Sequence, residues 1–276
     1  MTVAVGFFDG VHLGHQAILK GADAALTFRS HPLSVLAPEK APRLLMDFDD
    51  RVAAIRACGV RDVKVFDFTP EFARLSPDEF LATAGISSSV HVRCGANWRF
   101  GRGGEGDAEY LRTRGYSVEV VPYALYGDKE VSSTRIRAAL EGGEIEDANA
   151  MLGRAFSVRG SCVAGKGEGE RLGFPTLNVV PEGLNVRLPY GAYVVEAIGR
   201  RAVANYGFAP TFGARAWSTP VLEVHFLSAT PDLAPDSRQP TSFSILRFLR
   251  PERKFASEGE LRAQIASDCE AAAGSM

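Results

Sequence analysis

Short apolar runs alternate with helical patterns along the first 140 residues of the chain. The runs of strand length are residues 3–5, 24–28, 63–66, 90–94 and 118–121, and the clearest helical patterns between them are 51–58 and 77–84. Strands separated by helices favour an α/β fold, in which helices cover both faces of a parallel sheet. Ligands of such sheets bind beyond the carboxyl ends of the strands. We therefore expect the polar, glycine-containing loops after residues 5, 28 and 94 to gather on one edge.

The pattern changes near residue 153. Two helical stretches precede the change, and Ser132, Ser133 and Thr134 supply N-cap chemistry to the first of them. Beyond it, turn-rich segments separate the apolar runs 156–162, 192–198, 202–206, 221–227 and 243–249, and a helical pattern follows at 257–272. Several strands and one terminal helix predict a small β-barrel capped by a helix. We therefore divide the chain into an α/β domain, residues 1–153, and a β-barrel domain, residues 154–276.

The loop after the first predicted strand has the composition of an anion-binding turn. The run GFFDGVHLGH, residues 6–15, leads from that strand into a helical pattern. Free N–H groups and the dipole at a helix N-terminus favour negative charge, so a phosphate suits this position. His12 and His15 are three residues apart and share a helix face, while Gly14 leaves room for a ligand. The run predicts nucleotide binding, although two such histidines alone could be ordinary capping or surface residues.

Composition and charge limit the possible partners. The 31 basic and 33 acidic residues give a formal net charge of −2, so no global field attracts nucleic acid or an anionic membrane. No apolar run approaches the ~18 residues of a membrane helix. The four cysteines form no C-x-x-C pair, and the first motif leaves no room for a secretory signal. We expect a cytoplasmic protein that acts on small molecules, without a zinc site or disulfide framework; its oligomeric state is not indicated.

Two segments of the predicted barrel suit phosphate chemistry. Residues 165–169 form a glycine-rich loop whose backbone N–H groups could surround phosphates, although such loops often have no ligand. Thr176 and Asn178 alternate along an extended segment that Pro175 stiffens. Their hydroxyl and amide oxygens suit Mg²⁺, which prefers oxygen ligands.

The predicted strand at 221–227 carries a carboxylate. Its alternation puts Leu222, Val224 and Phe226 on one face and puts Glu223 and His225 on the other. A carboxylate on a strand of apolar residues suggests a face that lines a binding site. The alternative is an exposed strand face with ordinary polar residues.

Seven blocks of sequence, in order, match the pattern of one enzyme family. They are residues 6–15, 27–32 (TFRSHP), 94–101 (CGANWRFG), 132–137 (SSTRIR), 173–178 (GFPTLN), 205–212 (NYGFAPTF) and 223–225 (EVH). On these blocks the chain resembles the bacterial bifunctional riboflavin kinase/FMN adenylyltransferases, often called FAD synthetases. One block could arise by chance or in another nucleotidyltransferase, whereas seven in order over two domains are specific.

The resemblance implies that the first domain is a Rossmann-like nucleotidyltransferase that joins FMN to the α-phosphate of ATP, giving FAD and pyrophosphate. The FMN phosphate is already an anion near neutral pH, because its second pKa is about 6. The enzyme must therefore mainly position groups and stabilise charge. By resemblance, the site has His12 and His15 as catalytic residues, Ser133, Thr134 and Arg137 at the ATP phosphates, Gly6, Phe7 and Asp9 in the nucleotide pocket, Phe28 at the flavin, and Asn97 at the flavin phosphate or the magnesium ion.

The resemblance implies that the barrel is a riboflavin kinase that transfers a phosphoryl group from ATP to the ribityl 5′-hydroxyl of riboflavin. This hydroxyl must lose its proton, so a general base is needed, and Glu223 is the candidate. The resemblance assigns Thr176 and Asn178 to Mg²⁺. The candidates for the ATP phosphates are Gly165, Lys166 and Gly167.

The barrel departs from the family pattern at two places. Glu170 stands where the family commonly has arginine, and residues 229–233 replace an acidic family segment. An alternative function is therefore FMN adenylylation alone, with the barrel a catalytically weak flavin-binding or regulatory domain. Two further alternatives are a flavin or nucleotide-binding protein without turnover and a nucleotidyltransferase with another phosphorylated acceptor.

Overall fold

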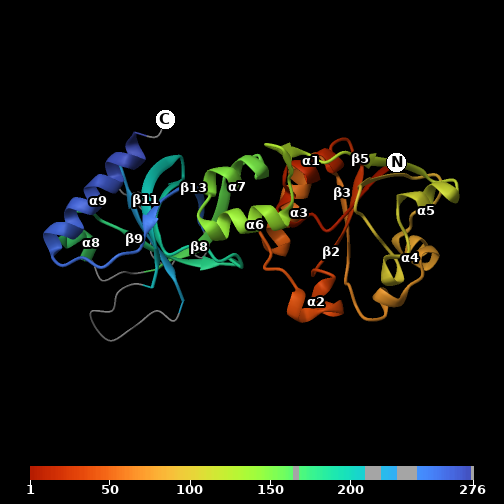
Figure 1. The fold of residues 1–276 in the computed structure, drawn as a ribbon, viewed down its shortest axis with the longest axis horizontal. Coiled ribbons are helices and arrows are strands. Elements are labelled where there is room, and N and C mark those ends of the chain that lie inside the picture. Colours follow the sequence, from red (N-terminus) through yellow and green to blue (C-terminus); the bar gives the residue numbers. More distant parts are fainter. Residues whose placement is uncertain (164–167, 209–218, 229–240, 275–276) are drawn as a thin grey trace. The chain divides into compact units, whose positions relative to one another are not determined.

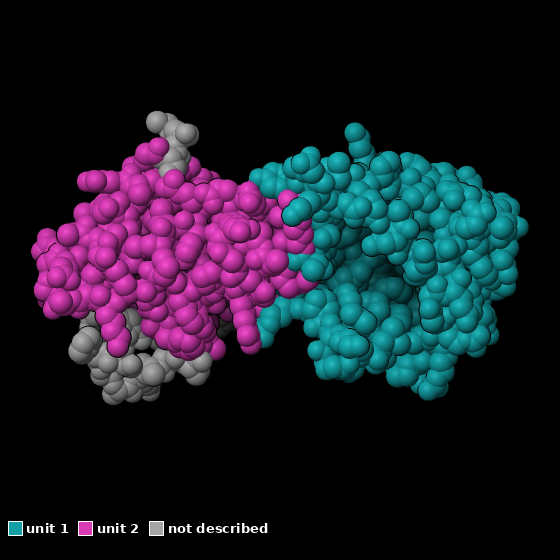
Figure 2. Space-filling model, in the orientation of Figure 1, with its two compact units in different colours: residues 1–134 teal, residues 135–276 magenta. Residues whose placement is uncertain are grey.

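The computed structural model describes residues 1–163, 168–208, 219–228 and 241–274, which form two compact units (Figures 1 and 2). Unit 1 comprises residues 1–134 and unit 2 comprises residues 135–276. Helix α7 (Ile145–Leu152) belongs to unit 2, because the Asn149 side chain donates to the carbonyl of Ile245 at 2.9 Å and accepts the N–H of Phe156 at 2.7 Å. The domain boundary at residue 153 stays a prediction.

Unit 1 is built on a five-stranded parallel sheet, which confirms the α/β prediction. Its strands are β1 (Thr2–Val5), β2 (Ala24–Phe28), β3 (Asp62–Phe66), β4 (His91–Gly95) and β5 (Ser117–Val121), in the order β3-β2-β1-β4-β5. Because β2, β1 and β4 are adjacent and parallel, the loops that follow them lie on one edge, as predicted. The strand order reverses direction between β1 and β4, and this is where ligands of such sheets bind.

Helices cover both faces of this sheet (Figure 1). The helices are α1 (Leu13–Leu19), α2 (Leu33–Leu36), α3 (Phe48–Ala57), α4 (Pro77–Ala84) and α5 (Ala108–Thr113); short 3-10 turns occur at Asp9–Val11, Pro38–Lys40, Phe72–Arg74 and Arg102–Gly104, and a hairpin is formed by β6 (Leu125–Tyr126) and β7 (Lys129–Glu130). Side chains alternate along β1, so Val3 and Val5 join a core with Phe80 of α4. On the other face, Ala4 joins a core with Ile55 of α3.

Capping residues set the ends of these helices. Helix α4 has the predicted bounds because Ser76 and Glu79 form a capping box and Gly85 ends the helix with φ 68°. Helix α3 begins three residues before the predicted residue 51, since the side chain of Asp47 accepts the N–H of Asp50 at 2.8 Å.

Unit 2 contains a closed six-stranded barrel, which confirms the predicted architecture. Its strands are β8 (Phe156–Val163), β9 (Leu177–Glu182), β10 (Gly191–Ala197), β11 (Arg200–Gly207), β12 (Val221–Phe226) and β13 (Thr241–Pro251), in the closed order β10-β11-β12-β9-β8-β13. The sequence pattern did not predict β9. The predicted strand 192–198 is shifted by one residue from β10, because Ile198 lies in the turn after β10 with φ 48°.

The helices of unit 2 are α6 (Ser133–Gly142), which begins at the end of unit 1, α7, α8 (Glu168–Arg171) and the terminal α9 (Glu258–Ala273). Helix α9 packs on the outside of the barrel, where Ala272 shares a buried cluster with Val194 and Val203. Arg250 holds the helix in place through hydrogen bonds of 2.7 to 3.1 Å to the buried carboxylate of Asp268. Within the described ranges, no helix combines the length and apolar character needed to cross a lipid bilayer.

Candidate active sites

The chain leaves β1 in a strained turn. Phe8 and Val11 have φ values of 59° and 40°, in the left-handed region that non-glycine residues rarely adopt. Each such residue typically costs ~1–3 kcal/mol, and packing must hold it in place. Both side chains are buried, and a Cβ at Gly6 would lie only 2.9 Å from the Phe8 ring. The packed core therefore fixes the backbone of this turn.

Asp9 connects the turn to two distant segments. Its carboxylate is buried and accepts the N–H of Leu45 at 2.9 Å, and its carbonyl accepts the hydroxyl of Ser133 at 2.8 Å. The structure thus brings two of the predicted motifs together, although they are more than 120 residues apart. Thr134 is exposed beside Ser133. Arg137 lies one turn further along α6, within unit 2, and its contact with ATP stays a prediction.

The two histidines stack on each other at the start of α1. Their ring centres are 3.6 Å apart with the planes inclined by 20°, and Nδ1 of His12 accepts the N–H of His15 at 3.4 Å. A Cβ at Gly14 would lie 3.2 Å from the His12 ring. The glycine therefore makes room for the His12 ring, whereas the sequence analysis had assigned that room to the ligand.

His15 is neutral at neutral pH. Burial, and to a smaller extent the nearby His12, lower the pKa of His15 well below its usual 6.5. Its Nδ1 is buried and has no hydrogen-bond partner among the described residues. His15 can therefore offer a hydrogen bond to a phosphate without carrying a positive charge.

The two predicted flavin residues lie at the same edge of the sheet. Phe28 ends β2, and its ring meets those of Phe68 and Phe72 edge-on, with centres 5.2 and 5.4 Å apart. Asn97 follows β4, and its Oδ1 lies 3.5 Å from the position of a Cβ added at Gly95. Figure 2 shows a hollow in this unit, bordered by the parts of the fold that carry β2 and α4 in Figure 1.

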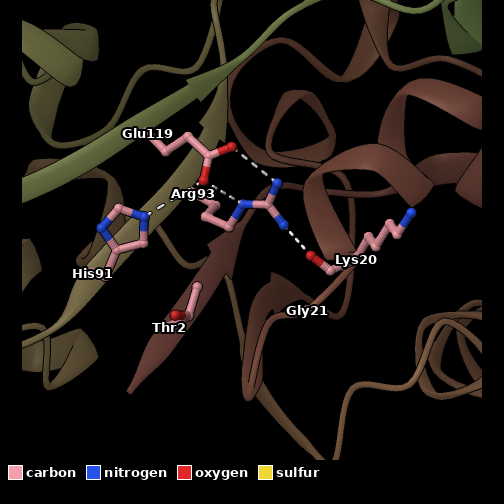
Figure 3. A pocket seen from close by; sticks show the side chains of 6 residues that line it. All are labelled: Thr2, Lys20, Gly21, His91, Arg93 and Glu119. Atoms are coloured by element: carbon pink, nitrogen blue, oxygen red, sulfur yellow. Dashed lines mark hydrogen bonds and ion pairs between the residues drawn. The ribbon is translucent and has the colours of Figure 1, made fainter.

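A second hollow lies beside strands β1, β4 and β5 (Figure 3). This pocket of about 540 Å³ is lined by Thr2, Lys20, Gly21, His91, Arg93 and Glu119. Arg93 makes two bonds of 2.9 and 3.0 Å to the carboxylate of Glu119 and also donates to the carbonyl of Lys20. Thr2 and His91 begin their strands, so the pocket lies away from the carboxyl edge and does not belong to the predicted site.

In unit 2, Glu223 lies in a row of three polar residues. Strand pairing puts it opposite Asn205 of β11 on one side and Asn178 of β9 on the other. Directly opposed residues of antiparallel strands point to the same face. Val203 shares the face of Asn205 and packs against Ala272 of α9, so this is the outer face of the barrel. The sequence analysis gave Asn205 no role, because only the register of the strands places it beside Glu223.

The segment before β9 is held from two sides. Nδ1 of His225 donates to the carbonyl of Pro175 at 2.9 Å, and the His225 ring meets the Phe174 ring edge-on. On the other side, the N–H of Phe174 donates to the carbonyl of Gly169 at 2.8 Å. A Cβ at Gly169 would lie 2.8 Å from Oγ1 of Thr176. These contacts fix the backbone that carries Thr176, immediately before β9.

Comparison with known proteins assigns each part of the chain to a family. The FAD synthetase family model matches residues 1–135, and the riboflavin kinase model matches residues 152–276. The bifunctional riboflavin kinase/FMN adenylyltransferase of Escherichia coli K12 is 33% identical over 291 residues, which cover 97% of this chain and 90% of the relative. The chain belongs to this bifunctional family. The Bacillus subtilis member is 31% identical over 289 residues, with the same coverage of both chains.

A solved structure supports the same fold. A protein of Streptococcus pneumoniae described as a macrolide-efflux protein aligns with a TM-score of 0.86 and 28% identity. The alignment covers 100% of this chain and 94% of that one.

Two sequence predictions lie outside the described residues. They are the phosphate contacts of Gly165, Lys166 and Gly167 and the altered segment 229–233. In the described part of the chain, no cluster of three His, Cys, Asp or Glu side chains could hold a metal ion. The hydroxyl oxygen of Thr176 and the amide oxygen of Asn178 are of the kind that Mg²⁺ prefers, a hard cation that binds few protein groups and shares phosphate ligands, and their role as its ligands stays a prediction.

Proposed function

We propose that this protein makes FAD from riboflavin in two ATP-dependent steps, one in each unit. The observation that carries the proposal is that each unit gathers the residues its reaction requires. In unit 1, a strained turn, a histidine pair and Ser133 meet at the carboxyl edge of a parallel sheet. In unit 2, a carboxylate lies between two amides on the outer face of a barrel.

In unit 1, an oxygen of the FMN phosphate attacks the α-phosphorus of ATP, and the bond to pyrophosphate breaks. The nucleophile is already ionised, so the protein has no proton to remove. His12 and His15 donate hydrogen bonds to the phosphate oxygens on which charge develops, while the hydroxyl of Ser133 holds the start of α6 against the turn. The buried Asp9 keeps the turn and the start of α6 together during the reaction.

In unit 2, the ribityl 5′-oxygen of riboflavin attacks the γ-phosphorus of ATP while Glu223 accepts the hydroxyl proton, and ADP leaves. Asn205 and Asn178, which flank Glu223, orient the hydroxyl and the carboxylate. Thr176 and Asn178 would hold Mg²⁺ together with the ATP phosphates. When bound, the ion neutralises phosphate charge.

The match of the riboflavin kinase model to residues 152–276 supports two reactions over FMN adenylylation alone. Arg171, next to the unusual Glu170, pairs with Glu258 at 3.0 Å and is largely exposed. We place both activities in the cytoplasm, with ATP, riboflavin and FMN as the small-molecule partners.

The proposal is tested by incubating the purified protein with riboflavin, ATP and MgCl₂ and separating the flavins by chromatography. We expect FMN to appear first and FAD to follow. Riboflavin that remains unchanged would exclude the kinase. Added FMN that yields no FAD would exclude the adenylyltransferase. A parallel incubation with EDTA is expected to stop both reactions, and activity in EDTA would contradict the magnesium assignment.

A further inference from the structure

The largest fully buried side chain in the described part of the protein is an arginine. Arg51 lies on α3 and has no exposed surface. Its Nη2 donates to two carbonyl groups at the end of β2, those of Phe28 at 2.6 Å and Arg29 at 2.8 Å. A residue on a covering helix therefore holds the backbone at the carboxyl edge of the sheet.

The same guanidinium reaches the turn after β1. Its central carbon lies 4.0 Å from the centre of the Phe7 ring, within cation–π distance. The carbonyl of Phe7 accepts the hydroxyl of Thr27 at 3.0 Å. Arg51 thus contacts one residue that the family resemblance assigns to the ATP pocket, Phe7, and another assigned to the flavin, Phe28.

Arg51 keeps its charge in this setting. Burial lowers its pKa to about 10, while the carboxylates of Asp9 and Asp47 favour the charged form. It is therefore protonated at neutral pH. Its Nε and Nη1 are buried and have no hydrogen-bond partner among the described residues.

Burying a charged side chain with unsatisfied donors is energetically unfavourable if the side chain serves only to fill space. Removing an ion from water costs several kcal/mol, and an apolar side chain of similar volume often packs as well or better. An arginine at this position is explained if its charge and its bonds to the two carbonyls shape the adenylyl-transfer site. Both reactants of the adenylyl transfer carry phosphate groups, and the positive charge reduces their mutual repulsion.

We propose that Arg51 is a positioning residue for adenylyl transfer, which fixes the ATP-side turn at Phe7 against the flavin-side end of β2. This inference rests on the proposed FMN adenylyltransferase activity. It assigns Arg51 no contact with the reacting atoms. Its effect passes through the carbonyls it holds and through its charge.

The test compares Arg51→Lys and Arg51→Met with Arg56→Met, which removes an exposed arginine from the same helix. Lysine keeps the charge and can donate to both carbonyls, whereas methionine of similar length does neither. For Arg51→Met we expect the KM for FMN to rise at least 10-fold and kcat to fall by up to ~10², the cost of a misplacement of about 1 Å. Arg51→Lys should recover most of both changes. Arg56→Met should match the parent, and riboflavin kinase activity should remain normal in all three proteins.

The KM values separate positioning from stability. A partly unfolded variant has fewer active molecules, which lowers the apparent kcat but leaves the KM unchanged. An Arg51→Met protein with parental KM values, or an Arg51→Lys protein no better than Arg51→Met, would overturn the inference. If the parent itself formed no FAD from FMN and ATP, the proposed function would fail, and that result is distinct from a parent that is active and insensitive to Arg51.

Discussion

Gly169→Ala is expected to damage the kinase while sparing the adenylyltransferase. The added Cβ would lie 2.5 Å from the carbonyl oxygen of Phe174 and 2.8 Å from Oγ1 of Thr176. The first contact is with backbone, so no side-chain rotation relieves it. The hydrogen bond between Phe174 and Gly169 also ties the two segments together. The segment that carries Thr176 must therefore move.

The size of the effect follows from these distances. Real Cβ atoms essentially never approach other atoms closer than 3.0 Å, so Phe174 must shift by about 0.5 Å or more. A misplacement of 1 Å can cost ~10² in rate. A misplacement of about half that distance therefore predicts a loss of about 10-fold in kcat/KM for riboflavin. Overpacking of this kind costs ~1–3 kcal/mol in the free energy of unfolding.

The assay is the steady-state formation of FMN from riboflavin, with FAD formation from added FMN measured on the same sample. Gly259→Ala provides the matched control, because Gly259 is exposed in the first turn of α9 and its added Cβ meets nothing closer than 3.8 Å. An unchanged kinase in Gly169→Ala would refute the assignment of Thr176 and its segment to the kinase site. So would an equal loss of both activities.

Two further predictions concern stability. Because the folded protein lowers the pKa of His15, the unfolded chain binds the proton first, so the free energy of unfolding should fall as the pH decreases below about 6.5, by up to ~1.4 kcal/mol per pH unit. Urea unfolding at several pH values should show this slope, and His15→Gln should reduce it; an identical slope in the variant would contradict the prediction. Asp268→Ala should lower the stability of unit 2 by about 3 kcal/mol, because it leaves Arg250 without its buried carboxylate. An unchanged urea midpoint for barrel unfolding would show that this pair does not hold α9.

Local signals predicted the elements whose ends are set locally. The bounds of β2 and α4 match the prediction, because the apolar pattern of β2 and the capping residues of α4 are local to each segment. Strand β9 (Leu177–Glu182) was missed because it contains Pro181 and depends on pairing with the preceding strand β8 and with β12, which is distant in sequence. Helix α5 was missed because it has only six residues.

The residues of the candidate sites also fall into two groups, those indicated by local sequence and those placed only by the tertiary structure. Sequence motifs indicated His12, His15 and Glu223, since their spacing and strand alternation are visible in the chain. Asn205 was missed because its place depends on strand register. The sequence analysis assigned Arg51 no role, because only tertiary packing brings its guanidinium to the carbonyls at the end of β2 and to the Phe7 ring. Periodicity indicates which face is apolar, but it does not reveal a charge that is buried by distant residues.

The most direct test of two separate active sites on one chain is the product pattern of two single variants, Glu223→Gln and His15→Ala, each given riboflavin and ATP and, separately, FMN and ATP. Glu223→Gln should leave riboflavin almost unconverted, with a loss of ~10²–10⁴ in rate, while it converts FMN to FAD normally. His15→Ala should accumulate FMN and form FAD ~10²–10³ times more slowly. Loss of both activities in either folded variant, or of neither in both, would contradict the account.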